Sequence, residues 1–415
     1  MKTKNSPFSA NIFQIIWIKH FISNKSVNTF KFIDGVNFYK SRFSLFVNVG
    51  KNLTKGNTYK INNYNDYKNN TFIIYDVLPH LRKEPNNLPE NIGVLKSIQY
   101  PGYLIHLDKF KNIDDYLLNT FSKNTRMKMR KFTKRLDECF EISTKMFFGN
   151  IDKTEYDRIF ENFMTLLQKR YSEKAISYNN MHPSEWNFYK EVAYPLILEK
   201  KASLFVVYDK NKPIAITYNY HTEDSLIDAI TVFDIDYSKF NIGYVNNLKI
   251  LNWCFDNHLK ILDFSKGYFD YKKRMCTLEY DFEYHIIFDK KSVISKLIAQ
   301  AYYNFLEFKT HLRNKNIDVK FHEFTYRLKN KIQSTTKEQI EITKLEKLPD
   351  SKDLIKINIE KDLNYSFLNK YVYDFLYLVV KSYNEIELCK VNNDNDDETF
   401  IMSCDSLIQQ IKFIN

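Results

Sequence analysis

The segment from Ser203 to Met275 constrains the fold most, because its hydrophobic pattern changes period in a defined order. Two apolar, β-branched runs separated by a turn-rich stretch predict a β-hairpin, and a third such run predicts another strand. Apolar residues then follow helical spacing, and a short apolar run predicts one more buried strand. In chain order these runs are Leu204–Tyr208, Ile214–Tyr220, Leu226–Phe233, Tyr244–Asn257 and Ile261–Phe264.

Two motifs lie on either side of the predicted helix. Phe233–Gly243 reads FDIDYSKFNIG, and Leu262–Lys272 reads LDFSKGYFDYK. The first resembles an aromatic-Asp-x-acidic-Tyr segment followed by small-x-Gly, and the second resembles a strand ending in Asp-aromatic that leads through glycine to Tyr-Lys. In this order, with one helix between them, they resemble the signatures of the BioF-like and CelD-like branch of the GNAT acyltransferases, which is related to the Fem-type aminoacyl transferases. The resemblance covers roughly residues 95 to 285.

The resemblance implies an α/β protein with tandem GNAT-like lobes, in which mixed, mainly antiparallel sheets are flanked by helices. It implies a degenerate N-terminal lobe and an acyltransferase lobe. The sequence pattern adds a helical extension and a small α+β C-terminal appendage of unknown role. These parts correspond to residues 1–95, 96–285, 286–332 and 340–415. A chain of 415 residues with 44% hydrophobic content is long and apolar enough to form more than one domain.

Composition restricts the partners and the compartment. The net charge of +11 favours anionic partners such as nucleic acid, nucleotides or a membrane surface, although a solvated basic surface gives the same composition. Five scattered cysteines without a CxxC motif favour reduced thiols and a cytoplasmic location. No stretch predicts a transmembrane segment. Neither a metal-binding histidine pattern nor a GxxxxGK loop occurs, which disfavours metal-dependent hydrolysis and nucleoside triphosphate chemistry.

Three helices are predicted ahead of the hairpin. The basic stretch Lys123–Arg135 begins near Ser122 and resembles the Arg-x-x-x-Arg helix of the family. A capping box at Asp152 begins a long amphipathic helix, and another helix begins at Pro183. The last two helices would cover one side of the sheet and line the cleft for the acceptor.

The resemblance implies acetyl-CoA or another acyl-CoA as cofactor. Its pyrophosphate would bind at the start of the predicted helix, where free N–H groups and the helix dipole favour an anion. The residues concerned are Asn241, Ile242, Gly243 and Tyr244. A typical GNAT loop has several glycines, so with a single glycine these residues could instead simply begin a helix.

Arg126 and Arg130 lie four residues apart and therefore share one face of the basic helix. By resemblance they would hold the phosphates of the cofactor or an anionic acceptor. The alternative is a solvated helix at the border of the fold.

A pair of acidic residues follows the third predicted strand. Asp236 is the candidate general base, acting through water, and Asp234 and Tyr237 are candidate substrate-binding residues. The alternative is that both carboxylates simply complement the positive end of the following helix.

The second motif supplies the other candidate catalytic residues. Asp263 lies at the end of a predicted buried strand, where an acid usually binds something or accepts backbone N–H bonds. Tyr271 could donate a proton to the leaving thiolate, and Lys272 could hold a phosphate or the acceptor's carboxylate. If the resemblance is functional, these side chains should lie near one pocket with the start of the helix.

The function implied by the resemblance is acyl-CoA-dependent N-acylation of a small-molecule amine or an envelope or polysaccharide precursor. One alternative is a Fem-type transferase that uses aminoacyl-tRNA, which the basic charge and the two-lobe layout favour. Another is a catalytically silent binding module in which residues 340–415 bind a protein partner.

Overall fold

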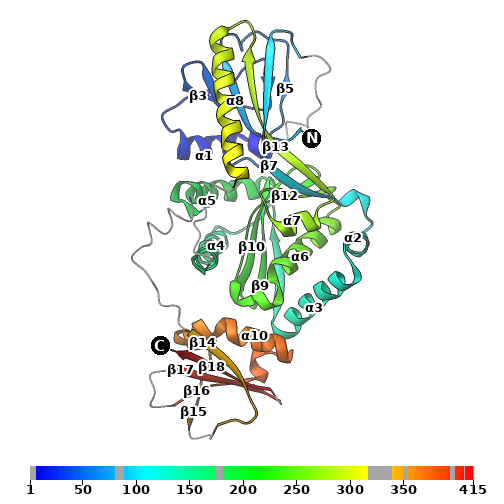
Figure 1. Cartoon of the computed structure of the whole chain (residues 1–415), viewed down its shortest axis with the longest axis vertical. Coiled ribbons are helices and arrows are strands. Elements are labelled where there is room, and N and C mark those ends of the chain that lie inside the picture. The colour runs from blue at the N-terminus through cyan, green and yellow to red at the C-terminus, as the bar shows by residue number, and fades with distance from the viewer. Residues whose placement is uncertain are drawn as a thin grey trace.

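The computed structural model describes residues 6–79, 88–173, 181–315, 339–349, 353–392, 398–405 and 407–414. These residues form an α/β structure with one large mixed sheet, helices on its faces and a separate smaller sheet at the C-terminal end (Figure 1). The predicted α/β class and the separate C-terminal appendage are confirmed.

Within the described residues, the large sheet has eleven strands in the order β1-β3-β4-β6-β13-β7-β12-β11-β10-β9-β8. Their bounds are β1 Val27–Asn28, β3 Phe38–Arg42, β4 Leu45–Asn48, β6 Thr71–Val77, β7 Ile92–His106, β8 Ile142–Phe147, β9 Ala202–Asp209, β10 Lys212–His221, β11 Ser225–Phe233, β12 Ile261–Lys266 and β13 Leu278–Asp289. β2 Ile33–Asp34 and β5 Lys60–Ile61 form a separate pair.

Two long strands join the halves of this sheet. β7 and β13 pair with each other along most of their length, β13 also pairs with β6, and the end of β7 pairs with β12. The lobe boundaries predicted at residues 95/96 and 285/286 therefore fall inside β7 and β13. The sheet is continuous across both positions, so the division into lobes stays a prediction.

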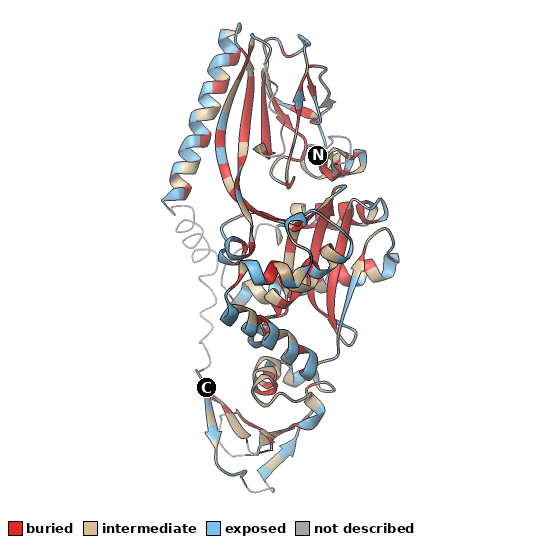
Figure 2. Ribbon diagram, turned by 90° about the vertical axis from the view of Figure 1, so that its right-hand side faces the viewer, coloured by how far each residue is buried: buried red, intermediate tan, exposed pale blue. Residues whose placement is uncertain are grey.

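The helices of the main body are η2 Pro7–Ser9, α1 Asn11–Phe21, η4 Leu107–Lys109, α2 Ile113–Thr120, α3 Lys123–Cys139, α4 Lys153–Glu173, α5 Pro183–Leu198, η6 Ile235–Phe240, α6 Ile242–Asp256, α7 Asp270–Met275 and α8 Val293–Asn314. α4 and α5 cover one face of the second half of the sheet, as predicted, and α6 covers the other face (Figure 1). The strands between these layers are largely buried (Figure 2).

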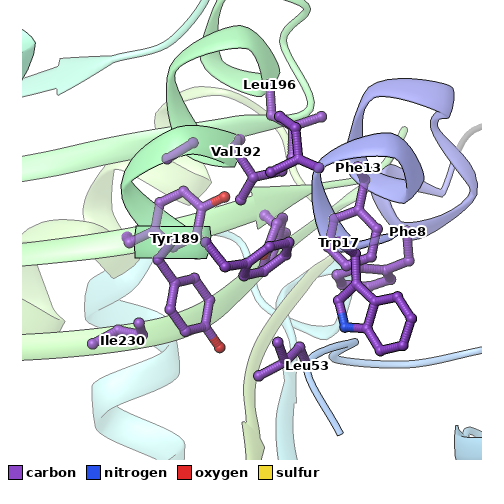
Figure 3. Close-up of a cluster of buried hydrophobic side chains, with 14 of the residues drawn as sticks. Phe8, Phe13, Trp17, Leu53, Tyr189, Val192, Leu196 and Ile230 are labelled. Carbon is purple, nitrogen blue, oxygen red and sulfur yellow. The ribbon is translucent and has the colours of Figure 1, made fainter. Parts of the chain in front are cut away.

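The N-terminal helix connects the two halves through an aromatic core. Phe13 lies 5.5 Å from Phe188 of α5, measured between ring centroids, and 6.4 Å from Tyr220 of β10. Figure 3 shows Phe13 on the side of α1 toward α5, with Trp17 below it, and Trp17 lies 5.7 Å from Tyr39 of β3. Because large aromatic side chains contribute much of the burial energy, the contact of Phe13 with Phe188 and Tyr220 fixes α1 against the second half of the sheet.

The C-terminal appendage forms its own sheet and packs against the main body. Its elements are β14 Gln339–Leu345, β15 Leu354–Lys356, η8 Leu363–Leu368, α10 Asn369–Val379, η9 Tyr383–Glu385, β16 Glu387–Val391, β17 Glu398–Cys404 and β18 Leu407–Ile414. The ring of Tyr373 in α10 lies 4.7 Å from that of Tyr237 in η6, measured between centroids, at a tilt of 48°. The guanidinium of Arg135 lies 4.4 Å above the ring of Tyr377. The appendage therefore covers η6 and the end of α3.

None of the helices in the described part of the chain combines the length and the apolar composition needed to cross a bilayer.

Candidate active site

The parallel strands β11 and β12 separate soon after they pair. Their pairing covers only Ser225–Ile227 with Ile261–Asp263. After Asp263 the register between β12 and β7 shifts, and Ser265 adopts a φ of +58°. Because such an irregularity bends a strand, β12 turns away from β11 and leaves space at the carboxyl ends of both.

A cavity of about 550 Å³ occupies this space, between the two halves of the sheet. Its walls come from the loop after β4, from α4 and α5 on one side of the sheet, and from α6 and α7 on the other. Among the described residues, five basic side chains line it, Lys55, Arg170, Lys266, Lys272 and Lys309, against the acidic Glu185 and Asp228. This excess of positive charge favours an anionic ligand.

Asp228 is the buried carboxylate of the cavity wall. A bulge at Ala229, between the pairs Tyr218–Ile230 and Asn219–Asp228, interrupts the pairing of β10 with β11 at this point. The hydroxyl of Thr231 donates to both carboxylate oxygens of Asp228, at 2.9 and 3.0 Å. Burial raises the pKa of Asp228, against the opposing effect of Lys272. A carboxylate with a raised pKa is suited to accept a proton near neutral pH.

The start of α6 forms the opposite wall, where Gly243 and Asn247 line the cavity. The N-cap residue Asn241 has a φ of +54°, and its side chain does not cap the helix. The N–H of Asn241 donates to the carbonyl of Ser238 and that of Tyr244 to the carbonyl of Asn241, both at 2.9 Å, which leaves the N–H groups of Ile242 and Gly243 for a ligand. The side chains of Asn241 and Ile242 do not line the cavity.

Gly243 itself is required by packing. A Cβ at this position would lie 2.8 Å from Cε1 of Phe233, and the ring of Phe233 lies 4.1 Å below the guanidinium of Arg170. Gly243 was predicted to let the cofactor approach the backbone. In the structure, its missing side chain leaves space for the ring of Phe233, which forms part of the cavity wall.

Tyr271 and Lys272 of α7 line the same cavity as Gly243. The ammonium of Lys272 is buried and donates to the carbonyl oxygens of Phe264, at 2.6 Å, and Lys266, at 3.2 Å. Burial lowers the pKa of Lys272, although Asp228 and Asp263 act in the opposite direction. Lys272 thus ties the loop after β12 to α7, and this leaves less of its ammonium for a ligand.

Comparison with known proteins agrees with this arrangement. Residues 123–273 match the family model described as acetyltransferase (GNAT) domain. The fold is that of the GNAT superfamily. In this GNAT fold, the matched segment runs from α3 into α7 and contains Asp228, Gly243, Tyr271 and Lys272. Comparison with curated protein sequences gives no match.

Several solved structures are similar to this chain at low sequence identity. FemX is similar with a TM-score of 0.44 and 10% identity, covering 67% of this chain and 91% of that chain. The C-terminal domain of a putative lysylphosphatidylglycerol synthetase from Agrobacterium fabrum has a TM-score of 0.41 and 8% identity, covering 70% of this chain and 91% of that chain. A tandem GNAT protein from the clavulanic acid biosynthesis pathway has a TM-score of 0.33 and 8% identity, covering 66% of this chain and 87% of that chain.

Asp263, one of the predicted catalytic residues, lies in the GNAT core outside the cavity lining. It accepts two hydrogen bonds from the hydroxyl of Tyr280, at 2.9 and 2.7 Å, and one from the backbone N–H of Ser265, at 2.7 Å. Burial raises the pKa of Asp263 to about 6, although the Tyr280 bond acts in the opposite direction. These bonds fix the bend at the end of β12, and the structure does not bring Asp263 into the cavity.

We expect Asp263→Asn to reduce the pH dependence of stability. A carboxyl whose folded-state pKa is raised contributes stability that is fully present below its unfolded pKa and is lost as pH rises through the folded pKa. From pH 4 to pH 7, the wild-type free energy of unfolding should therefore fall by roughly 2 kcal/mol relative to the variant. Chemical denaturation at several pH values measures this difference, with the exposed Asp256→Asn as control. Parallel pH profiles for wild type and Asp263→Asn would contradict the buried, titrating carboxyl.

The acidic pair after β11 is neutralised by lysines and does not line the cavity. Asp234 accepts from Lys169 at 2.5 Å and Lys212 at 2.9 Å, and Asp236 also pairs with Lys169. Burial opposes ionisation of Asp234, but the two lysines hold its pKa below the ordinary value. Burial and the charge of Asp234 raise the pKa of Asp236. The structure does not bring the predicted base Asp236 or its neighbour Asp234 to the cavity.

The remaining predicted residues lie on the α3 side of α6. Tyr237 is fully buried and donates to Asp209 at 2.8 Å, and Tyr244 packs beneath the guanidinium of Arg274. Arg126 donates to the carbonyls of the α2–α3 connection, and Arg130 makes an exposed 3.9 Å ion pair with Asp114. None of these four side chains lines the cavity. A role of Arg126, Arg130 and Tyr244 in cofactor binding stays a prediction.

Sequence reasoning missed most ionisable groups of the cavity, among them Lys55, Glu185 and Asp228. Only Asp228 carried a local signal, because it is a single carboxylate within the apolar run of β11, and buried acids are rare without a partner or a function. Lys55 and Glu185 reach the cavity only through the packing of distant segments. No group of three or more His, Cys, Asp or Glu side chains in the described ranges is arranged to hold a metal ion.

Proposed function

We propose that this protein is an acyl-CoA-dependent N-acyltransferase that transfers an acyl group to an amine within the cavity between β11 and β12. The observation that carries the proposal is the convergence on one cavity of the uncapped start of α6, the buried carboxylate of Asp228 and the phenol-bearing side chain of Tyr271. The matched GNAT domain supports acyl transfer as the reaction class.

The start of α6 fits the phosphate-bearing cofactor. Helix N-termini bind phosphate groups through free N–H groups and the helix dipole, and Asn241 leaves this end without a side-chain cap. The nearby carboxylates of Asp234 and Asp236 do not oppose an anion, because Lys169 and Lys212 neutralise them. An acyl-CoA supplies the acyl group as a thioester. Asn241, Ile242 and Gly243 would hold its phosphates.

Asp228 and Tyr271 would transfer the protons of the reaction, Asp228 as the base and Tyr271 as the acid. The carboxylate of Asp228 takes a proton from the acceptor's ammonium, which frees the nitrogen lone pair for attack on the thioester carbonyl. As the C–N bond forms and the C–S bond breaks, the phenol of Tyr271 donates a proton to the departing sulfur. The second proton lost by nitrogen returns through solvent to Tyr271, so the proton balance closes.

The acceptor would enter from the α4 and α5 side. Arg170, Tyr171, Glu185 and Tyr189 line the cavity there, opposite the start of α6. The cofactor and the acceptor would therefore approach from opposite faces of the sheet and meet where β11 and β12 separate. This arrangement supports the prediction that the two helices line the acceptor cleft.

Calorimetry with acetyl-CoA and with a longer acyl-CoA tests the proposal. We expect a Kd below about 1 mM for at least one donor, and about fivefold weaker binding after Asn247→Leu, since a lost hydrogen bond costs about 1 kcal/mol. Asn252→Leu, on the exposed face of α6, is the matched control.

The same measurement separates the alternatives. Binding of aminoacyl-tRNA in place of acyl-CoA, with affinity falling steeply between about 50 and 200 mM salt, would replace the proposal with the Fem-type function. A silent module acting through residues 340–415 would bind neither donor.

A further inference from the structure

Lys55 stands apart from the other lysines of the cavity. Its side chain is only 8% exposed and lines the cavity, yet its ammonium makes no hydrogen bond or ion pair with any residue that the structure describes. By contrast, Lys266 pairs with Asp76, and Lys272 donates to two backbone carbonyls. A buried charge without a partner is costly, so its presence at a cavity indicates that a ligand supplies the partner.

The loop that carries Lys55 is fixed by its own hydrogen bonds. The hydroxyl of Thr54 donates to Asp76 at 2.8 Å, and the side-chain amide of Asn57 donates to Thr54 at 3.0 Å and to the carbonyl of Tyr75 at 2.8 Å. The backbone N–H of Asn57 also donates to the carbonyl of Asp76, at 2.6 Å. Thr54 and Asn57, which flank Lys55 and Gly56, are therefore both hydrogen-bonded to β6. These bonds hold the ammonium of Lys55 toward the cavity before any ligand binds.

The charges around Lys55 belong to the acceptor side of the cavity. Lys266 and Lys272 repel its ammonium, while Asp76, Asp228 and Glu185 attract it without contacting it. Burial, reinforced by the two lysines, lowers the pKa of Lys55 to about 8, so the side chain stays mostly protonated at neutral pH. Burial also raises the pKa of Glu185, against the effect of Lys55. The residue two positions earlier, Leu53, lines the same cavity as Tyr189 of α5 and Ile230 of β11.

We propose that the amine acceptor carries an anionic group, a carboxylate or a phosphate, and that Lys55 binds this group while the acceptor's amine lies at Asp228. This inference rests on the proposed function. The acceptor would then be a compact zwitterion or an amine with a phosphate nearby, with its positive end toward Asp228 and its negative end toward Lys55. Lys55 would be a specificity-determining residue supplied by the N-terminal half of the sheet.

Anion binding tests the site without any acyl transfer. We expect acetate or inorganic phosphate to raise the thermal midpoint of the wild-type protein and of the control Lys60→Met, whose side chain is exposed, by clearly more than that of Lys55→Met. The shift should shrink between pH 7 and pH 9, as Lys55 loses its proton. Comparing acetate with phosphate identifies the preferred anion. Equal anion shifts in wild type and Lys55→Met would overturn the proposal.

Matched amines test the site during turnover. Thiol release from acyl-CoA is compared for glycine against methylamine and for O-phosphoethanolamine against ethanolamine. We expect at least one amine that carries an anionic group to have a kcat/KM about tenfold or more above that of its partner without this group. Lys55→Met should remove this advantage while leaving acetyl-CoA affinity unchanged. A Lys55→Met protein that loses acetyl-CoA affinity instead would assign Lys55 to the cofactor and overturn the inference. If anions bind in a Lys55-dependent way but no donor releases a thiol, the proposed function is contradicted while the anion site at Lys55 stands.

Discussion

Asp228→Asn should lower kcat by about 10²- to 10⁴-fold, the range usual for loss of a general base. The amide cannot take a proton from the acceptor's ammonium, although it has nearly the same shape and can still accept from Thr231. Because burial raises the pKa of Asp228, the acidic limb of the wild-type profile of kcat/KM against pH should lie above the ordinary carboxylate range. The variant should lack this limb.

The matched control is Asp224→Asn, just before β11. Asp224 is partly exposed and pairs with Lys260 at 3.1 Å on the surface, so its loss should change kcat less than twofold. Initial rates of thiol release at saturating acyl-CoA measure both variants, and calorimetry measures acyl-CoA affinity. An Asp228→Asn enzyme with wild-type kcat and pH profile would remove Asp228 from the mechanism and leave the fold assignment intact.

Tyr271→Phe should lower kcat by roughly ten- to a thousandfold, with little change in acyl-CoA affinity, if its phenol protonates the departing thiolate. The ring would keep its edge contacts with Phe264 and Phe269, at centroid distances of 6.0 Å for both, so the cavity wall should persist. A donor with a better leaving group, such as an aryl thioester of the acyl group, should recover part of the lost rate, because its sulfur needs less protonation.

Tyr268→Phe is the comparison for this experiment. Tyr268 lies just before α7, is 60% exposed and does not line the cavity. Full activity of Tyr271→Phe, or an equal loss in Tyr268→Phe, would show that the phenol of Tyr271 does not transfer the proton.

The sequence determined the elements whose signals are local. α3 begins at Lys123 because the hydroxyl of Ser122 accepts from the N–H of Thr125, and α5 begins at Pro183, whose fixed φ suits a first helical turn. The period of the apolar residues likewise predicted β9, β10, β11, α6 and β12 in their observed order. Capping and periodicity act within a few residues, so they can be recognised without knowing what the element packs against.

Tertiary structure alone decided which side chains reach the cavity. The irregularity after Asp263 buries that carboxylate against Tyr280, and the bulge at Ala229 coincides with the position where Asp228 reaches the cavity wall. Lys55 reaches the same cavity from a loop in the other half of the sheet, through the pairing of β7 with β13 and the bonds of its loop to β6. Such placements depend on where strands bend and on which distant segments meet, and a one-residue change in strand register moves a side chain to the opposite face. The sequence therefore predicted the GNAT fold and the strands that carry the site, while the partners of each charged side chain were set by packing.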